Sequence, residues 1–322
     1  MRTPFLQSGI HVFERGWLSA NNILFIGPDK ASLVDSGYCT HADQTLKLLE
    51  SVLHHRPLDV LINTHLHSDH CGGNAALQKR YPLVKTLIPP GQAGEVAQWD
   101  ETALTYKFTG QHCPKFEFCQ TLQPGTEVQL GTEQWQVHAA LGHDPHSIIL
   151  FEPVTKVLIS ADALWENGFG VVFPELDGTD AFSEVAATLH LIERLEPRTV
   201  IPGHGPVFIY TPDTLIKARQ RLDLFVSNPI KHARHAVKVL LKFKLLEVQQ
   251  QSIDDFSHWA RSTPYFELVR SRFFENVPFE IWLDQLFEEL IIAGAARKVE
   301  DRIMNFYHRV QLTPSRQKKK PN

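Results

Sequence analysis

Cysteine, long apolar runs and a leader-like N-terminus are scarce or missing in this chain of 322 residues. Its four cysteines are irregularly spaced and form no C-x-x-C pair, so we expect free thiols rather than a disulfide framework. No apolar run approaches the roughly 18 residues that a membrane span needs. Residues 1–7 lack the apolar core of a secretory signal. We therefore expect a cytoplasmic protein that makes no membrane contact.

The composition is that of an ordinary globular protein with two unlike parts. Hydrophobic residues make up 43% and charged residues 21%, which argues against extended disorder. The length suits one large domain and a smaller one. Residues 211–322 hold 19 Lys and Arg against 13 Asp and Glu, a net charge of +6, which leaves residues 1–210 at −10. We expect a catalytic domain over residues 1–210, a second domain over 211–310 and a basic, disordered tail over 311–322.

A dense group of imidazoles and carboxylates lies in residues 64–74, which read THLHSDHCGGN directly after a short apolar run. His65 and His67 are two positions apart, so both side chains can point towards one ion. Asp69 and His70 continue round the turn, where they can reach a second ion. Zinc and related metals bind imidazole nitrogen and carboxylate oxygen at about 2.0–2.2 Å, and catalytic sites keep a position open for water. The stretch therefore predicts a metal site.

The H-x-H-x-D-H pattern, placed after a strand and before a glycine pair, resembles the motif of the metallo-β-lactamase superfamily of metal-dependent hydrolases. Four further segments follow the order that this superfamily uses. They resemble its early strand-end aspartate, its third histidine segment, its bridging-aspartate segment and its final histidine. Their sequences are LVDSG at residues 33–37, GHDPHS at 142–147, SADAL at 160–164 and PGHG at 202–205.

The resemblance implies a site for two divalent metal ions, which we expect to be zinc, with iron or manganese as alternatives. One ion would be held by His65, His67 and His143. The other would be held by Asp69, His70 and His204, and Asp162 would bridge the two.

The resemblance also implies roles for residues around the ions. Asp35 would orient a ligand imidazole by a hydrogen bond. His146 would do the same or touch the substrate. Asp69 would, in addition, orient the nucleophile, which is a hydroxide made available when two cations lower the pKa of a shared water.

The order of short apolar runs and helical patterns indicates sheets covered by helices. Strands are expected within residues 10–35, 58–63, 83–88, 128–159 and 199–201, and several end directly before a predicted ligand. Helices are expected at residues 41–54, 75–80 and 182–195. Strands that repeatedly deliver ligands, with helices between them, indicate sheet layers covered by helices. The αββα sandwich implied by the resemblance is one such α/β arrangement.

Residues after Pro212 read as helices followed by a hairpin within residues 298–306. That order resembles a winged-helix module, which some relatives in the superfamily carry at the C-terminus. Lys231, Arg234, Lys238 and Lys242 recur at helical spacing. A nucleic-acid-binding regulator with a metal domain as its sensor is therefore an alternative, although such a stripe more often forms a solvated helix face.

The expected function is hydrolysis of a small ester, thioester or lactone, as in the hydroxyacylglutathione hydrolases. His67 stands where diiron flavoprotein relatives usually have glutamate, which argues against redox chemistry. A phosphodiester (RNA) hydrolase is the alternative within the same class, but an acidic catalytic part would repel a polyanion. Two aromatic segments, residues 91–120 and 165–180, are the candidates for the substrate wall. The sequence identifies neither the substrate nor the oligomeric state.

Overall fold

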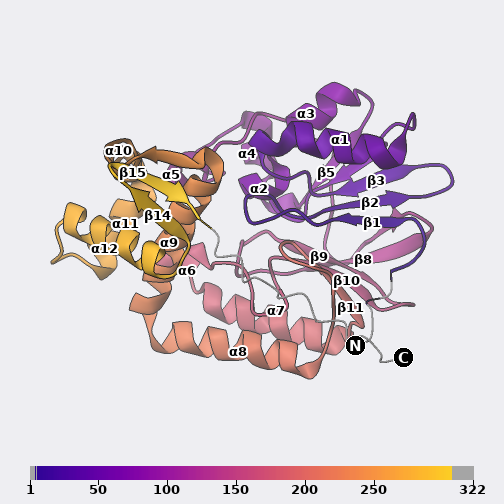
Figure 1. The fold of residues 1–322 in the computed structure, drawn as a ribbon. Helices are drawn as coiled ribbons and strands as arrows, with labels where there is room; N and C mark the ends of the chain where they lie inside the picture. The colour runs from indigo at the N-terminus through magenta and orange to yellow at the C-terminus, as the bar shows by residue number, and fades with distance from the viewer. Residues whose placement is uncertain (1–3, 5, 307–322) are drawn as a thin grey trace, which may run out of the picture.

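The computed structural model of the protein describes residue 4 and residues 6–306. Two six-stranded sheets lie face to face and are covered by helices on both outer sides, so the prediction of an αββα sandwich is confirmed (Figure 1). Further helices and a small third sheet, orange to yellow in Figure 1, lie beside the sandwich. The basic tail expected over residues 311–322 lies outside the described residues.

The first sheet has the strand order β1-β2-β3-β4-β5-β6. Strands β3, β4, β5 and β6 run parallel to one another, whereas the β1–β2 and β2–β3 pairs are antiparallel. Parallel neighbours end at the same edge, so the loops after β3 and β4 lie side by side. The strands are β1 (Ile10–Phe13), β2 (Asn22–Ile26), β3 (Ala31–Val34), β4 (Val60–Ile62), β5 (Lys85–Ile88) and β6 (Gln120–Thr121).

The second sheet has the order β12-β11-β10-β9-β8-β7, in which only the β10–β11 pair is parallel. The loops after β10 and β11 therefore leave from one edge as well. The strands are β7 (Glu127–Leu130), β8 (Glu133–Ala139), β9 (Ile148–Glu152), β10 (Val157–Ala161), β11 (Thr199–Pro202) and β12 (Phe208–Ile209).

Successive side chains along a strand face different layers of the sandwich. In β2, Ile23 and Phe25 face the second sheet and pack near Trp135, while Leu24 faces outward to the helix that carries Leu49. This is the period of two that a strand imposes. The covering helices on the first side are α1 (Ala42–Leu53) and α3 (Asn74–Arg80), and on the second side α7 (Ala181–Leu195) and α8 (Pro212–Ser227).

Short helices surround the edge where the metal motif lies. They are α2 (Ser68–Cys71), α4 (Ala93–Gln98), α5 (Tyr106–Thr109) and α6 (Phe173–Asp177), with single 3₁₀ turns at Cys39–His41 and Pro90–Gln92. Both segments expected as a substrate wall thus contain a short helix flanked by loops.

The C-terminal helices share a hydrophobic core of their own around Trp282, Phe256 and Phe266. Pro229 and Pro264 occupy the first turns of two of these helices, where proline's missing N–H costs nothing. The elements are α9 (Pro229–Val248), α10 (Ile253–Ser262), α11 (Pro264–Phe273), α12 (Phe279–Ile292), and a sheet of β13 (Gln250–Ser252), β15 (Arg302–Asn305) and β14 (Ala296–Val299).

The expected hairpin is β14–β15, and β13 adds a third strand that the sequence did not predict. The winged-helix assignment stays a prediction. The domain boundary after residue 210 also stays a prediction, and α8, which follows it, packs on α7 in the core of the sandwich. Within residues 6–306, no helix combines the length and apolar composition of a membrane span.

Candidate metal centre

The predicted ligands come together because they follow strands that end at the same edges of the two sheets. Asp35 comes directly after β3, and residues 64–74 begin two positions after β4 ends. Asp162 directly follows β10, and His204 lies two positions after β11. Since the sheets face each other, the two edges bring all these segments to one end of the sandwich.

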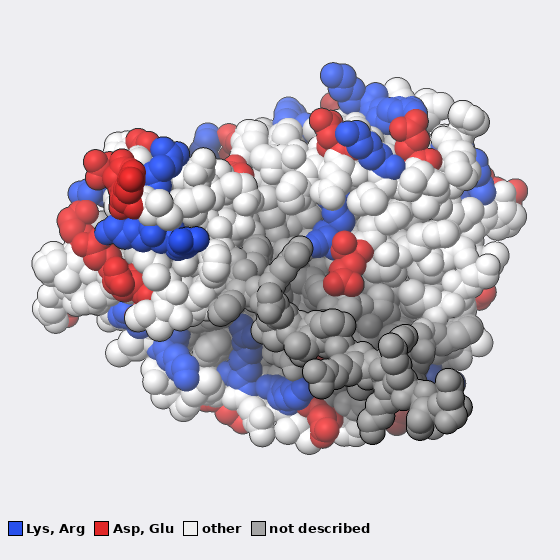
Figure 2. Space-filling view, in the orientation of Figure 1, with Lys and Arg blue, Asp and Glu red and all other residues white. Residues whose placement is uncertain are grey.

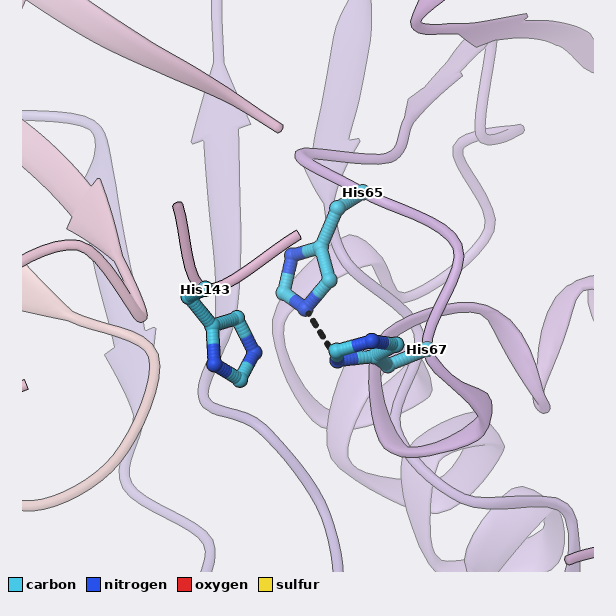
Figure 3. A group of neighbouring side chains, drawn as sticks. All are labelled: His65, His67 and His143. Atoms are coloured by element: carbon cyan, nitrogen blue, oxygen red, sulfur yellow. Dashed lines mark hydrogen bonds between the residues drawn. The ribbon is translucent and has the colours of Figure 1, made fainter. Parts of the chain in front are cut away.

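Three histidines converge in a first cluster (Figure 3). His65, His67 and His143 each offer a ring nitrogen, and these atoms lie within 4.8 Å of one another. His65 Nε2 is 3.1 Å from His67 Nδ1. The His143 Nδ1–H donates to the Val171 carbonyl over 2.6 Å, which leaves its Nε2 free to face the cluster.

A second cluster contains Asp69, His70, Asp162 and His204. Asp162 lies between the two clusters, because its Oδ2 is 3.4 Å from His143 Nε2 and 3.5 Å from His70 Nε2. The Asp69 Oδ2 is 3.1 Å from His204 Nε2. This placement agrees with the bridging position that the resemblance implied for Asp162.

Asp35 lies outside the second cluster and accepts a hydrogen bond from one of its histidines. Its Oδ2 accepts from His70 Nδ1 over 2.8 Å and from the Thr64 hydroxyl over 2.8 Å, and its Oδ1 accepts from the Thr64 N–H over 2.9 Å. The carboxylate is buried and its backbone is left-handed, with φ of 59°. An orienting partner of this kind sets which ring nitrogen of His70 points towards a ligand.

Burial and neighbouring charges shift the pKa values of the histidines and carboxyls of the site. Burial, followed by the neighbouring His67, lowers the pKa of His143 to about 4. Burial also lowers the pKa of His65 well below its usual value. Burial opposes ionisation of Asp162, but the nearby His204 and His70 outweigh it and hold that carboxyl's pKa well below its usual range. His65 and His143 are therefore neutral, which is the state in which an imidazole binds a metal. Burial opposes protonation of His70 and His204, but the neighbouring carboxylates outweigh it and raise the pKa of both rings.

Two observations show that the clusters fit metal ions. The Nε2 atoms of His70 and His143 are buried and have no hydrogen-bond partner among the described residues, a costly state that a bound cation would relieve. Glycine also keeps the space open: a Cβ on Gly203 would lie 2.2 Å from Asp162 Oδ1, and one on Gly170 would lie 2.5 Å from His143 Nδ1. The nitrogen and oxygen donors suit zinc or a related divalent metal.

A cleft of about 310 Å³ opens in front of both clusters. Both segments expected as a wall contribute to it, through Phe108 of α5 and Phe173 of α6. The C-terminal helices supply the opposite side, where Tyr265 makes edge contacts with both of those rings at centroid distances of 5.4 Å. The remaining apolar side chains of that side come from α9 and are Val239, Leu240 and Phe243.

Like Asp35, His146 is a predicted site residue that lies outside the two clusters. Its ring lines the cleft and packs over Gly91, where a Cβ would come within 2.0 Å of it. No hydrogen bond joins this ring to a cluster histidine within the part of the chain that the structure describes. Instead, Asp144 Oδ2 lies 3.7 Å from His67 Nε2, so the neighbouring carboxylate is the closer candidate for orienting a ligand.

Two tryptophans border the second cluster. Trp165 belongs to the segment 165–180 that was expected as a substrate wall, whereas Trp17 was not predicted. Trp17 stacks on the His204 ring at a centroid distance of 5.4 Å, and Trp165 Nε1 donates to Asp162 Oδ1 over 3.2 Å. The two indoles contact each other edge to face at 5.2 Å. Trp165 lies three residues after the bridging aspartate, which is a local signal, but Trp17 precedes every motif and its position follows only from the fold.

Comparison with known proteins identifies the family of the sandwich. The sequence pattern of the metallo-beta-lactamase superfamily matches residues 15–204. The diflavin flavoprotein A 1 of Synechocystis is 26% identical over 213 residues, and a hydroxyacylglutathione hydrolase of Mesorhizobium japonicum is 27% identical over 114 residues. The human acyl-coenzyme A thioesterase MBLAC2 is 26% identical over 194 residues.

These relatives are matched only in part. The matched segments cover 61%, 35% and 57% of this chain, and 35%, 37% and 66% of the respective relatives. Among solved structures, a metallo-beta-lactamase family protein from Thermus thermophilus aligns over 93% of this chain and 99% of its own, with a TM-score of 0.53 and 16% identity. That likeness concerns the fold alone.

Proposed function

Because the chain belongs to the metallo-beta-lactamase superfamily of metallo-hydrolases, we propose that it hydrolyses a small ester, thioester or lactone at two bound divalent metal ions. His65, His67 and His143 would hold one ion, and Asp69, His70 and His204 the other, with Asp162 between them. Zinc is the proposed metal, and iron or manganese would fit the same donors.

The observation that carries the proposal is the apolar wall of the cleft. Aromatic and aliphatic side chains from α5, α6, α9 and α11 face the two polar clusters across about 310 Å³. A cavity of this size that is largely apolar, with a few convergent polar groups, suits a small substrate with an acyl part. A polyanionic strand would gain little from such a wall.

The chain's own side chains would position the reaction. Bound metal ions supply a water of lowered pKa and polarise the substrate's carbonyl oxygen. Burial opposes ionisation of Asp69, but His70 and His204 lower the pKa of its carboxyl, so it is ionised and would accept a hydrogen bond from the attacking water. Trp165 fixes the rotamer of Asp162, and Trp17 shields the outer side of His204 from water.

Two relatives support an acyl substrate through their names, since one is an acyl-coenzyme A thioesterase and another a hydroxyacylglutathione hydrolase. The match to a flavoprotein gives less support to redox chemistry than these two matches give to hydrolysis. His67 occupies the place where diiron flavoproteins usually have a glutamate, and it lies in the first cluster beside His65.

The second candidates are phosphodiester hydrolysis and nucleic-acid binding by the C-terminal part. The basic stripe on α9 supports them less than its spacing indicated, because Arg234 and Lys238 both pair with Glu289. Lys242 donates to the Ala295 carbonyl over 2.6 Å. On the face shown in Figure 2, basic and acidic side chains lie side by side over the C-terminal part on the left, which is unlike a continuous phosphate-binding surface.

The test measures metal content together with hydrolysis of a thioester, a lactone and a bis-aryl phosphodiester. We expect two metal ions per chain, turnover of the thioester or lactone, and loss of at least about a hundredfold in kcat/KM in Asp162→Asn and His67→Ala. Asp29→Asn, which removes an exposed carboxylate far from the cleft, should behave as wild type. Turnover of the phosphodiester alone would instead establish the nuclease alternative, and a metal-free protein would overturn the site.

A further inference from the structure

A second pocket of about 430 Å³ lies directly behind the tryptophan pair of the metal cleft. Its near side is formed by Trp17 and Trp165, and its far side by α9 and α12. The two cavities share five lining residues, which are Trp17, Trp165, Val171, Val239 and Phe243. The two cavities therefore adjoin each other at the indoles.

The second pocket has a basic end, unlike the metal cleft. Arg221 of α8 lies against the rings of Phe169 and Phe225, with its guanidinium carbon 5.5 and 5.4 Å from their centroids. Its Nη2 donates to His235 Nε2 over 2.9 Å. Its Nε is buried and has no hydrogen-bond partner among the described residues.

The local backbone is shaped to hold this side chain. Gly168 has φ of 127°, and a Cβ at that position would lie 2.9 Å from Arg221 Cδ. The glycine thus lets the loop after Trp165 close over the arginine, whose orientation is then set by two rings and a histidine. A guanidinium placed in this way is preorganised and loses little side-chain entropy on binding a ligand.

The charges around Arg221 are not balanced within the pocket. Lys238 and Lys242 line it together with Arg221, whereas Glu289 is the one carboxylate among its described lining residues. Glu289 is already engaged by Lys238 at 2.8 Å and by Arg234. No ion pair joins Arg221 to a carboxylate within residues 6–306. His235 cannot supply the missing negative charge, because it is a neutral acceptor: burial, followed by Arg221, lowers its pKa to about 3.

A partly desolvated guanidinium without a carboxylate is unfavourable unless a ligand supplies the negative charge. We propose that this pocket binds an anionic group of the substrate, a carboxylate or a phosphate, through Arg221. The substrate class is then an ester or thioester that carries its anion at the end remote from the scissile bond. This inference rests on the proposed hydrolase function.

The experiment uses matched pairs of thioesters that differ only in the remote group. S-butanoyl pantetheine phosphate is compared with S-butanoyl pantetheine, and S-butanoyl mercaptopropionate with its neutral amide. The variants are Arg221→Met, which keeps the length of the side chain and removes its charge, and Arg221→Lys, which restores a charge. Arg219→Gln is the control, because Arg219 lies on the same helix but pairs with Glu193 on the surface.

We expect wild type to have a lower KM for the charged member of at least one pair, and that pair identifies phosphate or carboxylate. Arg221→Met should raise this KM about tenfold or more, with kcat and the KM of the neutral member nearly unchanged. Arg221→Lys should recover part of the loss, and Arg219→Gln should match wild type. Equal KM values within both pairs, or an equal loss on charged and neutral members, would overturn the inference.

If none of these thioesters is hydrolysed, the hydrolase proposal has failed on thioesters and the pocket is tested by binding. Calorimetric titration of the metal-loaded protein with inorganic phosphate should then show binding that is lost in Arg221→Met at unchanged metal content. Phosphate bound at the metal ions would persist in that variant. Binding that persists, or is absent in wild type, would overturn the pocket independently of the reaction.

Discussion

Asp35 shows how one carboxylate organises a site that it does not directly enter. Its two oxygens accept three hydrogen bonds, from His70 and twice from Thr64, and thereby join the end of β3 to the start of the metal motif. The left-handed backbone at this position turns the side chain towards His70. Aspartate and asparagine tolerate that conformation better than most residues do.

Asp35→Asn is expected to keep the fold and weaken the metal centre. The amide presents a donor to His70 or to Thr64 where both now find an acceptor, so one hydrogen bond is lost and the imidazole is less well oriented. Loss of such an orienting partner lowers metal affinity by about ten- to a hundredfold. Competition with a chromophoric chelator measures the affinity, with Asp29→Asn as the matched control. Unchanged affinity in Asp35→Asn would show that Thr64 and the surrounding backbone orient His70 unaided.

At the residue scale, the motifs named side chains that the fold brings together, and their roles as metal ligands stay a prediction. The seven expected ligands fall into the two clusters at the expected division. Sequence reasoning was least informative about Asp144 and His146. Asp144 Oδ2 lies 3.7 Å from His67 Nε2, whereas no hydrogen bond joins the His146 ring to a cluster histidine within the described residues. Which of these two side chains approaches the cluster depends on the turn between β8 and β9, and the residue types there do not determine it.

At the scale of elements, helix α9 contributes side chains to three different regions of the structure. It contributes Leu240 and Phe243 to the metal cleft, His235 and Lys238 to the pocket behind the tryptophans, and Val237 to the C-terminal core. Its sequence pattern predicted a helix but not these roles. Periodicity reports that one face is apolar, whereas the partner of each face depends on how the helix docks.

The same helix carries an acid-sensitive contact with α8. His232 is buried against Phe182 and Phe225, and neither of its ring nitrogens has a hydrogen-bond partner among the described residues. Burial, followed by the charge of Arg221, lowers its pKa to about 4. The ring of His232 is therefore protonated near pH 6.5 in the unfolded chain but only near pH 4 in the folded chain.

Stability should accordingly be complete above pH 6.5 and fall as the pH drops through the window between the two values. The loss from this histidine is about 2 kcal/mol at pH 5. In His232→Phe, which fills the space with a ring that cannot be protonated, urea unfolding should show a smaller loss of stability between pH 8 and pH 5. His190→Phe on the exposed face of α7 is the control. A loss as large as that of wild type would place the acid-sensitive group elsewhere.

At the scale of the whole molecule, the metal centre lies where the two sheets and the C-terminal helices meet. Seven expected ligand side chains from both halves of the sandwich form the clusters, and α9 and α11 close the cleft. Metal ions bound there would connect the two sheets in addition to their shared hydrophobic core. The expected cytoplasmic location remains a prediction.

Removal of metal is therefore expected to destabilise the entire fold as well as abolish hydrolysis. A ligand present at a hundred times its Kd adds about 2.7 kcal/mol to the folded state, which for a chain of this size corresponds to a fall in Tm of several degrees on chelation. Differential scanning calorimetry with and without EDTA measures the shift. Asp162→Asn should show a smaller shift. An unchanged Tm in wild type would mean that the clusters bind no metal that stabilises the fold.

The sequence by itself determined the layers of the sandwich and the identity of the expected ligands. Both depend on local patterns: short apolar runs such as that of β2, apolar residues at helical spacing as in α7, and histidines and aspartates placed after strand ends. Only the tertiary structure decided what surrounds those ligands. Trp17, Arg221 and Phe243 are distant in sequence and belong to no motif, and they line one pocket because α8 and α9 dock against the edge of the sandwich. Docking depends on complementary packing between whole elements, and local periodicity does not encode it.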